Sequence, residues 1–352
     1  MPLRLALVLV VLVAFAAPPR AQTAWVNGLV TDAETGDPVP GARVFVSGAA
    51  VAAETDGEGR FVFSTTAPRA AEIVAAREGY GAAATDRTLV PGETVPIAFR
   101  LRPAPPAEAA AEPDAEAFEV FREAFIGSSG NAEATYVVNP HALVLRLDDD
   151  RLQAAATAPL VVRNAALGYE LTVYGFTLAA EDGLRVWDGH AVFRDLCAPS
   201  CGSAVAEARE VAYEGSLQHF LAAVAHDRLD DEGYRAGPVY EPYDGGSGLS
   251  INATRMTGSG YSVPDLERRR AGAGWAVETG GALRVSYKRE RDPRLRYNAP
   301  QVSWLTAPDG VLHVGPDGGL LRAEGVVHYG YWDWVRVADL LPADYRPARD
   351  EG

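Results

Sequence analysis

Histidine is the residue best suited to metal or proton chemistry near neutral pH, and the chain holds six of them. A zinc peptidase needs His-x-x-Glu with a distant third histidine, or His-Glu-x-x-His. No histidine here has Glu at the third following position, and His-Glu-x-x-His does not occur. The sequence therefore disfavours zinc peptidase activity, because none of its histidines lies in such a motif: His141, His190, His219, His226, His313 and His328.

Serine and phosphate chemistry also lack their usual patterns. A nucleophilic serine commonly lies in Gly-x-Ser-x-Gly, and the segments around Ser247 and Ser259 come near that pattern without matching it. Their composition is typical of a flexible loop. Neither a Gly-x-x-x-x-Gly-Lys phosphate loop nor a Gly-x-Gly-x-x-Gly dinucleotide pattern is present. The sequence predicts no catalytic residue and no cofactor.

The two cysteines lie close together in the segment Cys197-Ala-Pro-Ser-Cys201. In an exported protein, a disulfide between them is the expected state, because the surroundings are oxidising and Pro199 favours a turn. The alternative is a pair of reduced, small apolar residues. No second pair of cysteines and no nearby histidine completes a zinc site, so we expect no metal here.

Aromatic side chains are the remaining candidates for a binding surface, because they form platforms for sugar rings or for a partner protein. One group is Tyr329-Gly-Tyr331-Trp332-Asp-Trp334. Its alternative interpretation is that Tyr329 and Tyr331 face the core while Trp334 anchors a final helix capped by Asp333. The other group lies in an irregular loop. The expected binding residues are Tyr331 and Trp332, together with Tyr240, Tyr243 and Tyr261.

The elements that position these residues begin after an expected signal peptide, residues 1–21. Arg4 is followed by the apolar run Leu5–Ala17, two prolines and small residues up to Ala21. The rest of the chain has no apolar run long enough for a transmembrane helix. The net charge is −15, which disfavours nucleic acid as a partner. We therefore expect an exported protein, in the periplasm, at the outer membrane or outside the cell.

Residues 24–102 read as short strands separated by Gly and Pro turns, the pattern of an antiparallel β-sandwich. Val26-Asn-Gly-Leu-Val-Thr-Asp-Ala-Glu-Thr-Gly-Asp-Pro-Val-Pro-Gly-Ala-Arg-Val44 is followed by Thr55-Asp-Gly-Glu-Gly-Arg-Phe61. These segments closely resemble the carboxypeptidase regulatory-like family. The resemblance implies a prealbumin-like, transthyretin-like sandwich without chemistry of its own, and a weak link to carbohydrate binding. The motif glycines and aspartates are expected to form turns.

A linker rich in Pro, Ala and acidic residues occupies 103–115, and a second domain is expected over 116–346. Its pattern predicts a Phe-rich opening helix, a hairpin with Asp148–Asp150 at its solvated tip, and further strands. One long helix is expected over 203–230, with Gly215 offering a place to divide it and His219 at the edge of its apolar face. The fold class is thus mainly β: the sandwich plus a β-rich α+β domain. This second domain resembles an uncharacterised region of exported bacterial proteins.

The sequence favours a non-enzymatic envelope protein that binds or scaffolds another component through its C-terminal domain. One alternative is a carbohydrate-binding protein, and another is an enzyme whose site in that domain has no recognisable motif. The expected partner is another envelope protein or a glycan. We interpret the net negative charge as that of a solvated surface, which keeps the protein soluble.

Overall fold

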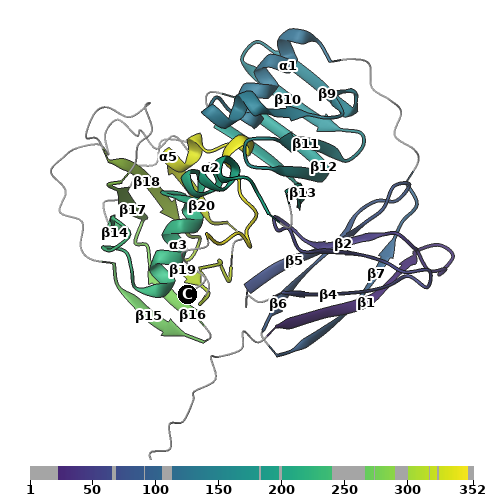
Figure 1. Cartoon of the computed structure of the whole chain (residues 1–352), viewed down its shortest axis with the longest axis horizontal. Helices are drawn as coiled ribbons and strands as arrows, with labels where there is room; N and C mark the ends of the chain where they lie inside the picture. The colour runs from purple at the N-terminus through teal and green to yellow at the C-terminus, as the bar shows by residue number, and fades with distance from the viewer. Residues whose placement is uncertain are drawn as a thin grey trace, which may run out of the picture.

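The computed structural model describes residues 23–65, 69–90, 92–104, 113–181, 184–197, 200–239, 266–272, 274–289, 300–316, 318–322 and 325–347. Their strands form five sheets. In Figure 1 the N-terminal sheets are purple and blue, the next sheet is teal and lies above them, and the last two are green and lie to the left. Tyr240, Tyr243 and Tyr261 lie outside the described residues.

The N-terminal part is a sandwich of a three-stranded sheet, β4-β1-β7, and a four-stranded sheet, β3-β2-β5-β6. Alternating side chains from both sheets fill one core that includes Val26, Val44, Phe61 and Ile73. β1 and β7 pair in parallel, and the other pairs of these sheets are antiparallel. The strands are β1 (Ala24–Asp32), β2 (Arg43–Val46), β3 (Ala52–Glu54), β4 (Arg60–Thr65), β5 (Arg69–Ala76), β6 (Ala83–Leu89) and β7 (Thr94–Leu101).

The aspartates of the family motif hold turns, as the sequence predicts. Asp32 accepts hydrogen bonds from the backbone N–H groups of Glu34 and Thr35, and Tyr80 donates its hydroxyl to the same carboxylate. Asp56 accepts from Arg60 in the same way. These backbone hydrogen bonds lower the pKa of both carboxyl groups. The motif therefore carries turn geometry in this domain.

The teal region contains a six-stranded sheet in which β8, β11, β12, β10 and β9 follow one another and β13 pairs with β12. α1 and the π-helical turn η1 cover one face, where Phe121 and Phe125 pack against Phe176. The elements are α1 (Ala115–Phe121), η1 (Arg122–Ile126), η2 (Gly130–Ala134), β8 (Thr135–Val137), η3 (Pro140–Ala142), β9 (Leu143–Asp148), β10 (Arg151–Ala156), β11 (Leu160–Asn164), β12 (Tyr169–Glu181) and β13 (Leu184–Asp195).

The remaining elements form a four-stranded sheet, β14-β17-β18-β20, and a three-stranded sheet, β15-β16-β19. They pack with α3 around Phe220, Leu283 and Trp332 in a core separate from that of the teal sheet. The elements are α2 (Ser203–Tyr213), α3 (Leu217–His226), β14 (Tyr234–Val239), β15 (Arg268–Ala271), β16 (Gly274–Glu278), β17 (Ala282–Tyr287), β18 (Gln301–Thr306), β19 (Val311–Val314), β20 (Val327–Gly330), α5 (Tyr331–Trp334) and η4 (Val337–Asp339).

The expected long helix is two helices, divided at Gly215. α2 ends at Tyr213 and α3 begins at Leu217, where the Ser216 side chain caps it by accepting from the backbone N–H of His219. Gly215 has φ +77°, a conformation that ends the first helix. The final helix also differs from expectation. α5 begins before Asp333, so Asp333 does not cap it, and the following turn, η4, is a separate 3₁₀ helix.

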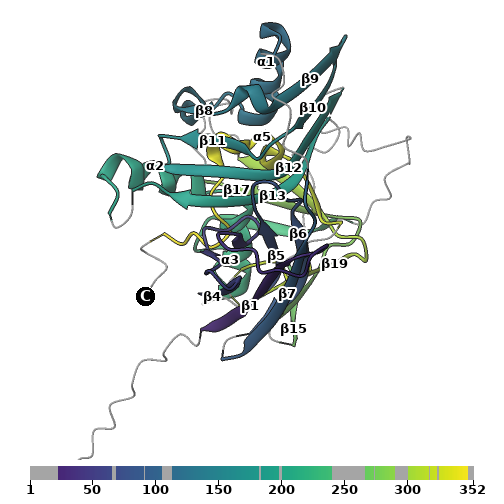
Figure 2. The same cartoon turned by 90° about the vertical axis from the view of Figure 1, so that its right-hand side faces the viewer.

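The sandwich packs against the teal sheet through a docking interface. Phe45 lies on the face of β2 opposite to Val44 and Val46, yet all three side chains are buried. Phe45 and Val74 form a small cluster with Val192 of β13. Figure 1 shows β2 and β5 below β13, and Figure 2 also shows β5 beside β13.

Backbone hydrogen bonds add to this interface. The N–H of Gly48 donates to the carbonyl of Ala191 at 2.7 Å, and the N–H of Phe193 donates to the carbonyl of Ala49 at 2.9 Å. Across the same interface, His190 Nδ1 lies 3.1 Å from Glu72 Oε2. The sandwich is thus held by apolar contacts, backbone hydrogen bonds and a polar pair.

Candidate functional site

The two expected binding aromatics of the C-terminal segment lie in different surroundings. Trp332 is 2% exposed and belongs to the core around Phe220. Its Nε1 donates to the carbonyl of Gly215 at 2.8 Å, and its backbone N–H donates to Ser303 Oγ at 3.2 Å. The indole of Trp332 is therefore enclosed by the core and does not form part of the surface.

Trp334 occupies the surface position instead, with 46% of its area exposed. A residue two places further along a helix points about 200° away from its predecessor, since each residue turns the helix by about 100°. Burial of Trp332 therefore turns Trp334 outward. Tyr331 lies beside Trp334, with ring centroids 5.7 Å apart, and is itself packed partly against the core.

His219 is a core residue held by hydrogen bonds. Its Nδ1 accepts from the backbone N–H of Gly215 at 3.1 Å, and its Nε2 lies 3.3 Å from Glu232 Oε2. The imidazole is surrounded by the rings of Tyr213, Tyr234 and Tyr287. These contacts satisfy both ring nitrogens, which assigns the residue to packing.

Cys197 and Cys201 form a disulfide. Among the described residues, the group of possible metal ligands that lies closest together is Asp195 with these two cysteines. Disulfide sulfurs are not thiolates and do not serve as zinc ligands. Arg209 also occupies the group, donating to both oxygens of Asp195. The geometry is that of a cross-linked loop.

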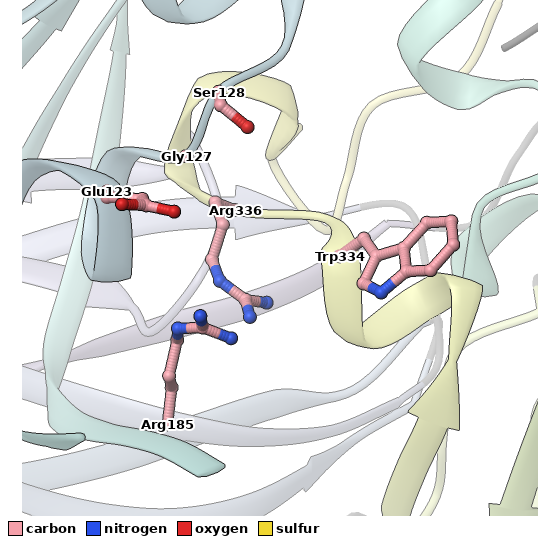
Figure 3. Close-up of a pocket in the computed structure, with 6 residues that line it drawn as sticks. All are labelled: Glu123, Gly127, Ser128, Arg185, Trp334 and Arg336. Atoms are coloured by element: carbon pink, nitrogen blue, oxygen red, sulfur yellow. The ribbon is translucent and has the colours of Figure 1, made fainter. Parts of the chain in front are cut away.

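A pocket of about 320 Å³ lies where η1, β13 and the segment after α5 meet. Figure 3 shows the guanidinium groups of Arg185 and Arg336 pointing toward one another, with the carboxylate of Glu123 directed toward Arg336. Trp334 also lines the pocket, and its indole extends away from the two guanidiniums in this view. The full lining is Glu123, Gly127, Ser128, Arg185, Trp334 and Arg336.

The elements that carry Trp334 and Arg185 are each held in place by a neighbouring side chain packed into the protein. The burial of Trp332 places Trp334, as described above. On β13, Arg185 shares a strand face with Trp187, whose ring packs 5.7 Å from that of Phe125 in η1. Residues far apart in the sequence are thereby held around one hollow.

The segment from Gly127 onward is fixed to the C-terminal region. Ser129 Oγ and Asn131 Nδ2 both donate to Asp339 Oδ1, each at 2.9 Å. A Cβ on Gly127 would lie 2.8 Å from Cβ of Arg336. Only glycine allows this close approach, so the absence of a side chain at residue 127 makes room for the stem of Arg336.

Two guanidiniums and two carboxylates gather at the pocket, those of Arg185, Arg336, Glu123 and Asp333. The Arg336 side chain is 14% exposed, and its Nη2 lies 3.8 Å from Asp333 Oδ2. Burial lowers the pKa of Arg336; Asp333 opposes this effect, and the positive charge of Arg185 adds to it. The guanidiniums of Arg185 and Arg336 repel each other in this partly desolvated place, and the carboxylate of Asp333 offsets part of that repulsion.

Sequence reasoning missed Arg185, Arg336 and Glu123, and it assigned Trp334 to a structural role. Arginine occurs throughout this chain, so neither position stands out by type. One signal was available: two tryptophans two places apart in a short helix cannot both face the core. A hydrogen-bonding partner for one of them decides which is buried, and that partner, Gly215, is remote in sequence.

Residues 26–102 match the family described as the carboxypeptidase regulatory-like domain. The chain thus contains such a domain, and the pocket lies outside it. No curated protein matches the chain. Of the described residues, no helix is long and apolar enough to span a membrane.

Solved structures give only distant matches. Hydroxyquinol 1,2-dioxygenase from Pseudomonas putida DLL-E4 is 15% identical over 23% of this chain and 57% of its own, with a TM-score of 0.20. A minor pilin of Streptococcus agalactiae is 19% identical over 26% of this chain and 48% of its own, also with a TM-score of 0.20. A DUF3823 family protein from Bacteroides ovatus ATCC 8483 is 10% identical over 50% and 82%, again at 0.20. Scores this low carry no argument about function.

Proposed function

We propose that the protein is a non-enzymatic binding protein of the cell envelope, which recognises a small ligand in the pocket between Arg185, Arg336 and Trp334. The observation that carries this proposal is the approach of two guanidiniums in a pocket whose lining also includes the half-exposed Trp334. Arginine and tryptophan are the residues most enriched where binding energy concentrates. A location in the cell envelope requires export of the protein, and we include export in the proposal.

The lining of the pocket supports binding more than catalysis. Arginine stays protonated at accessible pH, so neither guanidinium can act as a general base. Glu123 is the carboxylate of the pocket lining, and hydrolysis of a glycosidic bond ordinarily needs two. Ser128 is exposed, and the lining holds no histidine to activate its hydroxyl. These residues can hold a ligand without transferring a proton.

The sandwich has a supporting part in this proposal. It packs on β13, the strand that carries Arg185, through the interface of Phe45, Val74 and Val192. A binding strand that is packed on a second domain moves less, which lowers the entropy lost when a ligand binds. We infer that the docked sandwich stiffens the site and spaces it from the N-terminal end of the chain.

The proposal is tested by screening the chain without residues 1–21 against an array of neutral and acidic glycans and small phosphorylated metabolites. We expect at least one ligand whose retention falls tenfold or more in Trp334→Ala. Trp25→Ala is the matched control, because Trp25 is 47% exposed on the sandwich, close to the 46% of Trp334. If no ligand shows Trp334-dependent retention, the pocket is not the binding site and the proposal fails.

A further inference from the structure

A second pocket, of about 470 Å³, lies on the face of the teal sheet opposite to α1 and η1. It extends over four adjacent strands, in the order β9-β10-β12-β13. Alternate residues of a strand point to opposite faces, so Val186 and Asp188 of β13 line this pocket while Arg185 and Trp187 point to the other side. The sheet thus separates this pocket from that of Arg336, and a function here is independent of the proposed one.

The pocket is a groove, because its middle strands carry mostly small side chains and its outer strands carry larger ones. The floor residues on β10 and β12 are Gln153, Ala155, Thr177 and Ala179. The wall residues are Val144 and Arg146 on β9 and Val186 and Asp188 on β13. Neighbouring strands lie about 4.8 Å apart, so the two outer strands are separated by about 14 Å. That width accommodates one extended chain between the walls.

The docked sandwich closes one end of the groove. Gly175, with φ +67°, lies in a bulge of β12, so Thr177 beyond the bulge returns to the face that Tyr174 occupies before it. Tyr174 stacks on Phe45 of the sandwich, with ring centroids 5.5 Å apart, and His190 of β13 also contacts the sandwich. A broad second sheet laid on this face would meet the sandwich, whereas a narrow ligand would not.

The two walls carry opposite charges. Arg146 and Asp188 are both exposed, and among the described residues no side chain of opposite charge lies within ion-pair distance of either. Asp188 Oδ1 accepts from the backbone N–H of Gly189 at 2.8 Å. The strand spacing and register place the Cα atoms of the two charged residues about 16 Å apart. In an extended chain, side chains four residues apart span about 13 Å, and long charged side chains cover the difference.

The remaining lining favours a peptide over a sugar. The lining holds no aromatic ring on which a sugar could stack. Val144 is 47% exposed and Val186 is 68% exposed, so a ligand with small or branched apolar side chains would cover apolar area that now faces water. The side chains of Gln153 and Thr177 both donate and accept, which suits the amide groups of a peptide backbone.

We propose that this groove binds an extended peptide segment of a partner protein. The segment carries an acidic residue at Arg146, a basic residue four positions away at Asp188, and small or branched apolar side chains over the floor. The same face of β12 and β13 already holds the sandwich through Phe45, Val74 and Val192. The groove continues that interface and offers it to a second protein.

Fluorescence anisotropy with labelled, end-capped pentapeptides tests the ligand class. We expect Glu-Val-Ser-Val-Lys to bind the chain without residues 1–21 at least fivefold more tightly than Gln-Val-Ser-Val-Gln or Glu-Val-Ser-Val-Glu, because only the first peptide matches both walls. Equal binding of the three peptides rejects the charge pairing and, with it, the inference. If none of them binds, the groove does not hold a peptide of this pattern and the inference fails.

The variants assign the contacts. Arg146→Glu makes both walls acidic, so its preference should change to Lys-Val-Ser-Val-Lys. The double variant Arg146→Glu/Asp188→Arg should bind Glu-Val-Ser-Val-Lys as the wild type does, since the peptide can lie in the reverse direction. Ala155→Phe fills the floor and should abolish binding. Arg87→Glu, at an exposed position of β6 in the sandwich, is the matched control. Thermal melting separates a lost contact from a lost fold, and all these positions are exposed on strands.

Two further measurements identify a different occupant. A dimer of the wild type in sedimentation velocity that is absent from Ala155→Phe would assign the groove to a second copy of the chain and reject the peptide. Retention on a glycan array that Ala155→Phe abolishes, without peptide binding, would assign it to a sugar. Neither result bears on the pocket of Arg185 and Arg336, so this inference and the proposed function can fail separately.

Discussion

Arg209 shows how one buried cation can organise a loop. It is 7% exposed and donates to the carbonyl of Leu167, to both oxygens of Asp195 and to the Sγ of Cys197. Its guanidinium also lies 3.8 Å from the centroid of the Tyr169 ring. A single side chain on α2 therefore fixes the end of β13, the disulfide loop and the turn before β12.

Replacement of Arg209 by methionine should lower the free energy of unfolding by about 3 kcal/mol, because it removes one partner of a largely buried ion pair. Removing one partner of a buried ion pair costs about 3–5 kcal/mol. The cost here lies at the lower end of that range, since the Asp195 side chain is 33% exposed and can be rehydrated. Urea denaturation measures it. Arg194→Gln removes the more exposed of the two arginines paired with Glu170, which keeps Arg163, and should cost less than about 1 kcal/mol. Equal losses in the two variants would show that burial of Arg209 adds nothing.

At the scale of elements, the break between α2 and α3 is a junction of three hydrogen bonds. The carbonyl of Gly215 accepts from Gln301 Nε2 at 2.7 Å and from Trp332 Nε1 at 2.8 Å, while its N–H donates to His219. A helix that continued through this position would use these backbone groups internally. Ending the helix here frees them to tie β18 and α5 to the helical pair.

Gly215→Ala should destabilise the protein by about 2–4 kcal/mol. The positive φ alone costs about 1 kcal/mol, and the added Cβ would lie 2.5 Å from Gln301 Oε1 and 2.9 Å from the Tyr287 ring. Gly36→Ala is the control, because Gly36 has φ +80° with nothing within 4 Å of the added Cβ. Its loss of stability, followed by chemical denaturation, should be about 1 kcal/mol. The steric part of this account is wrong if the two variants unfold at the same denaturant concentration.

Elements were more predictable than the site. Alternating apolar residues and Gly or Pro turns predict the strands of the sandwich and the hairpin of β9 and β10, because strand periodicity and turn chemistry are local properties. Which of Trp332 and Trp334 is buried is not a local property, since it depends on the hydrogen bond of Trp332 to the carbonyl of Gly215. The meeting of Arg185 and Arg336 likewise depends on tertiary packing. The sequence therefore predicts the mainly β fold and leaves the pocket undetermined.

At the scale of the whole molecule, the docking interface includes a polar pair that titrates. The hydrogen bond that His190 makes to the Glu72 carboxylate raises the pKa of His190 above its usual 6.5, burial opposes this effect, and Asp188 adds to it. The same bond lowers the pKa of Glu72, against the effect of burial and with help from Ser47. Glu72 lies on β5 of the sandwich, and His190 lies on β13.

The sign of the pH dependence follows from these directions. The contribution of His190 is complete below its unfolded pKa and is lost as pH rises through the raised value. That of Glu72 is complete above its unfolded pKa, near 4.5, and is lost as pH falls through the lowered value. The pair therefore stabilises docking most at weakly acidic pH.

Between pH 5.5 and 8.5, the melting temperature of the wild type should fall about 2 °C more than that of His190→Gln, a small change because both side chains are partly exposed. Differential scanning calorimetry measures the difference. His141→Gln, which alters an exposed histidine of η3, should behave as the wild type does. Parallel curves for wild type and His190→Gln would contradict a role for the pair.

The C-terminal segment of the described chain contacts the sandwich between β2 and β3. The N–H of Ala343 donates to the carbonyl of Gly48 at 2.8 Å, and Asp344 Oδ1 accepts from the N–H of Ala50 at 2.9 Å. During synthesis, the seven strands of the sandwich are made before β13 and can fold before it. Phe45 and Val74 then stay uncovered until β13 is made, and the contacts at Gly48 and Ala50 form only once residues 343–344 follow. A nascent chain therefore presents an apolar patch that the folded protein conceals beneath β13.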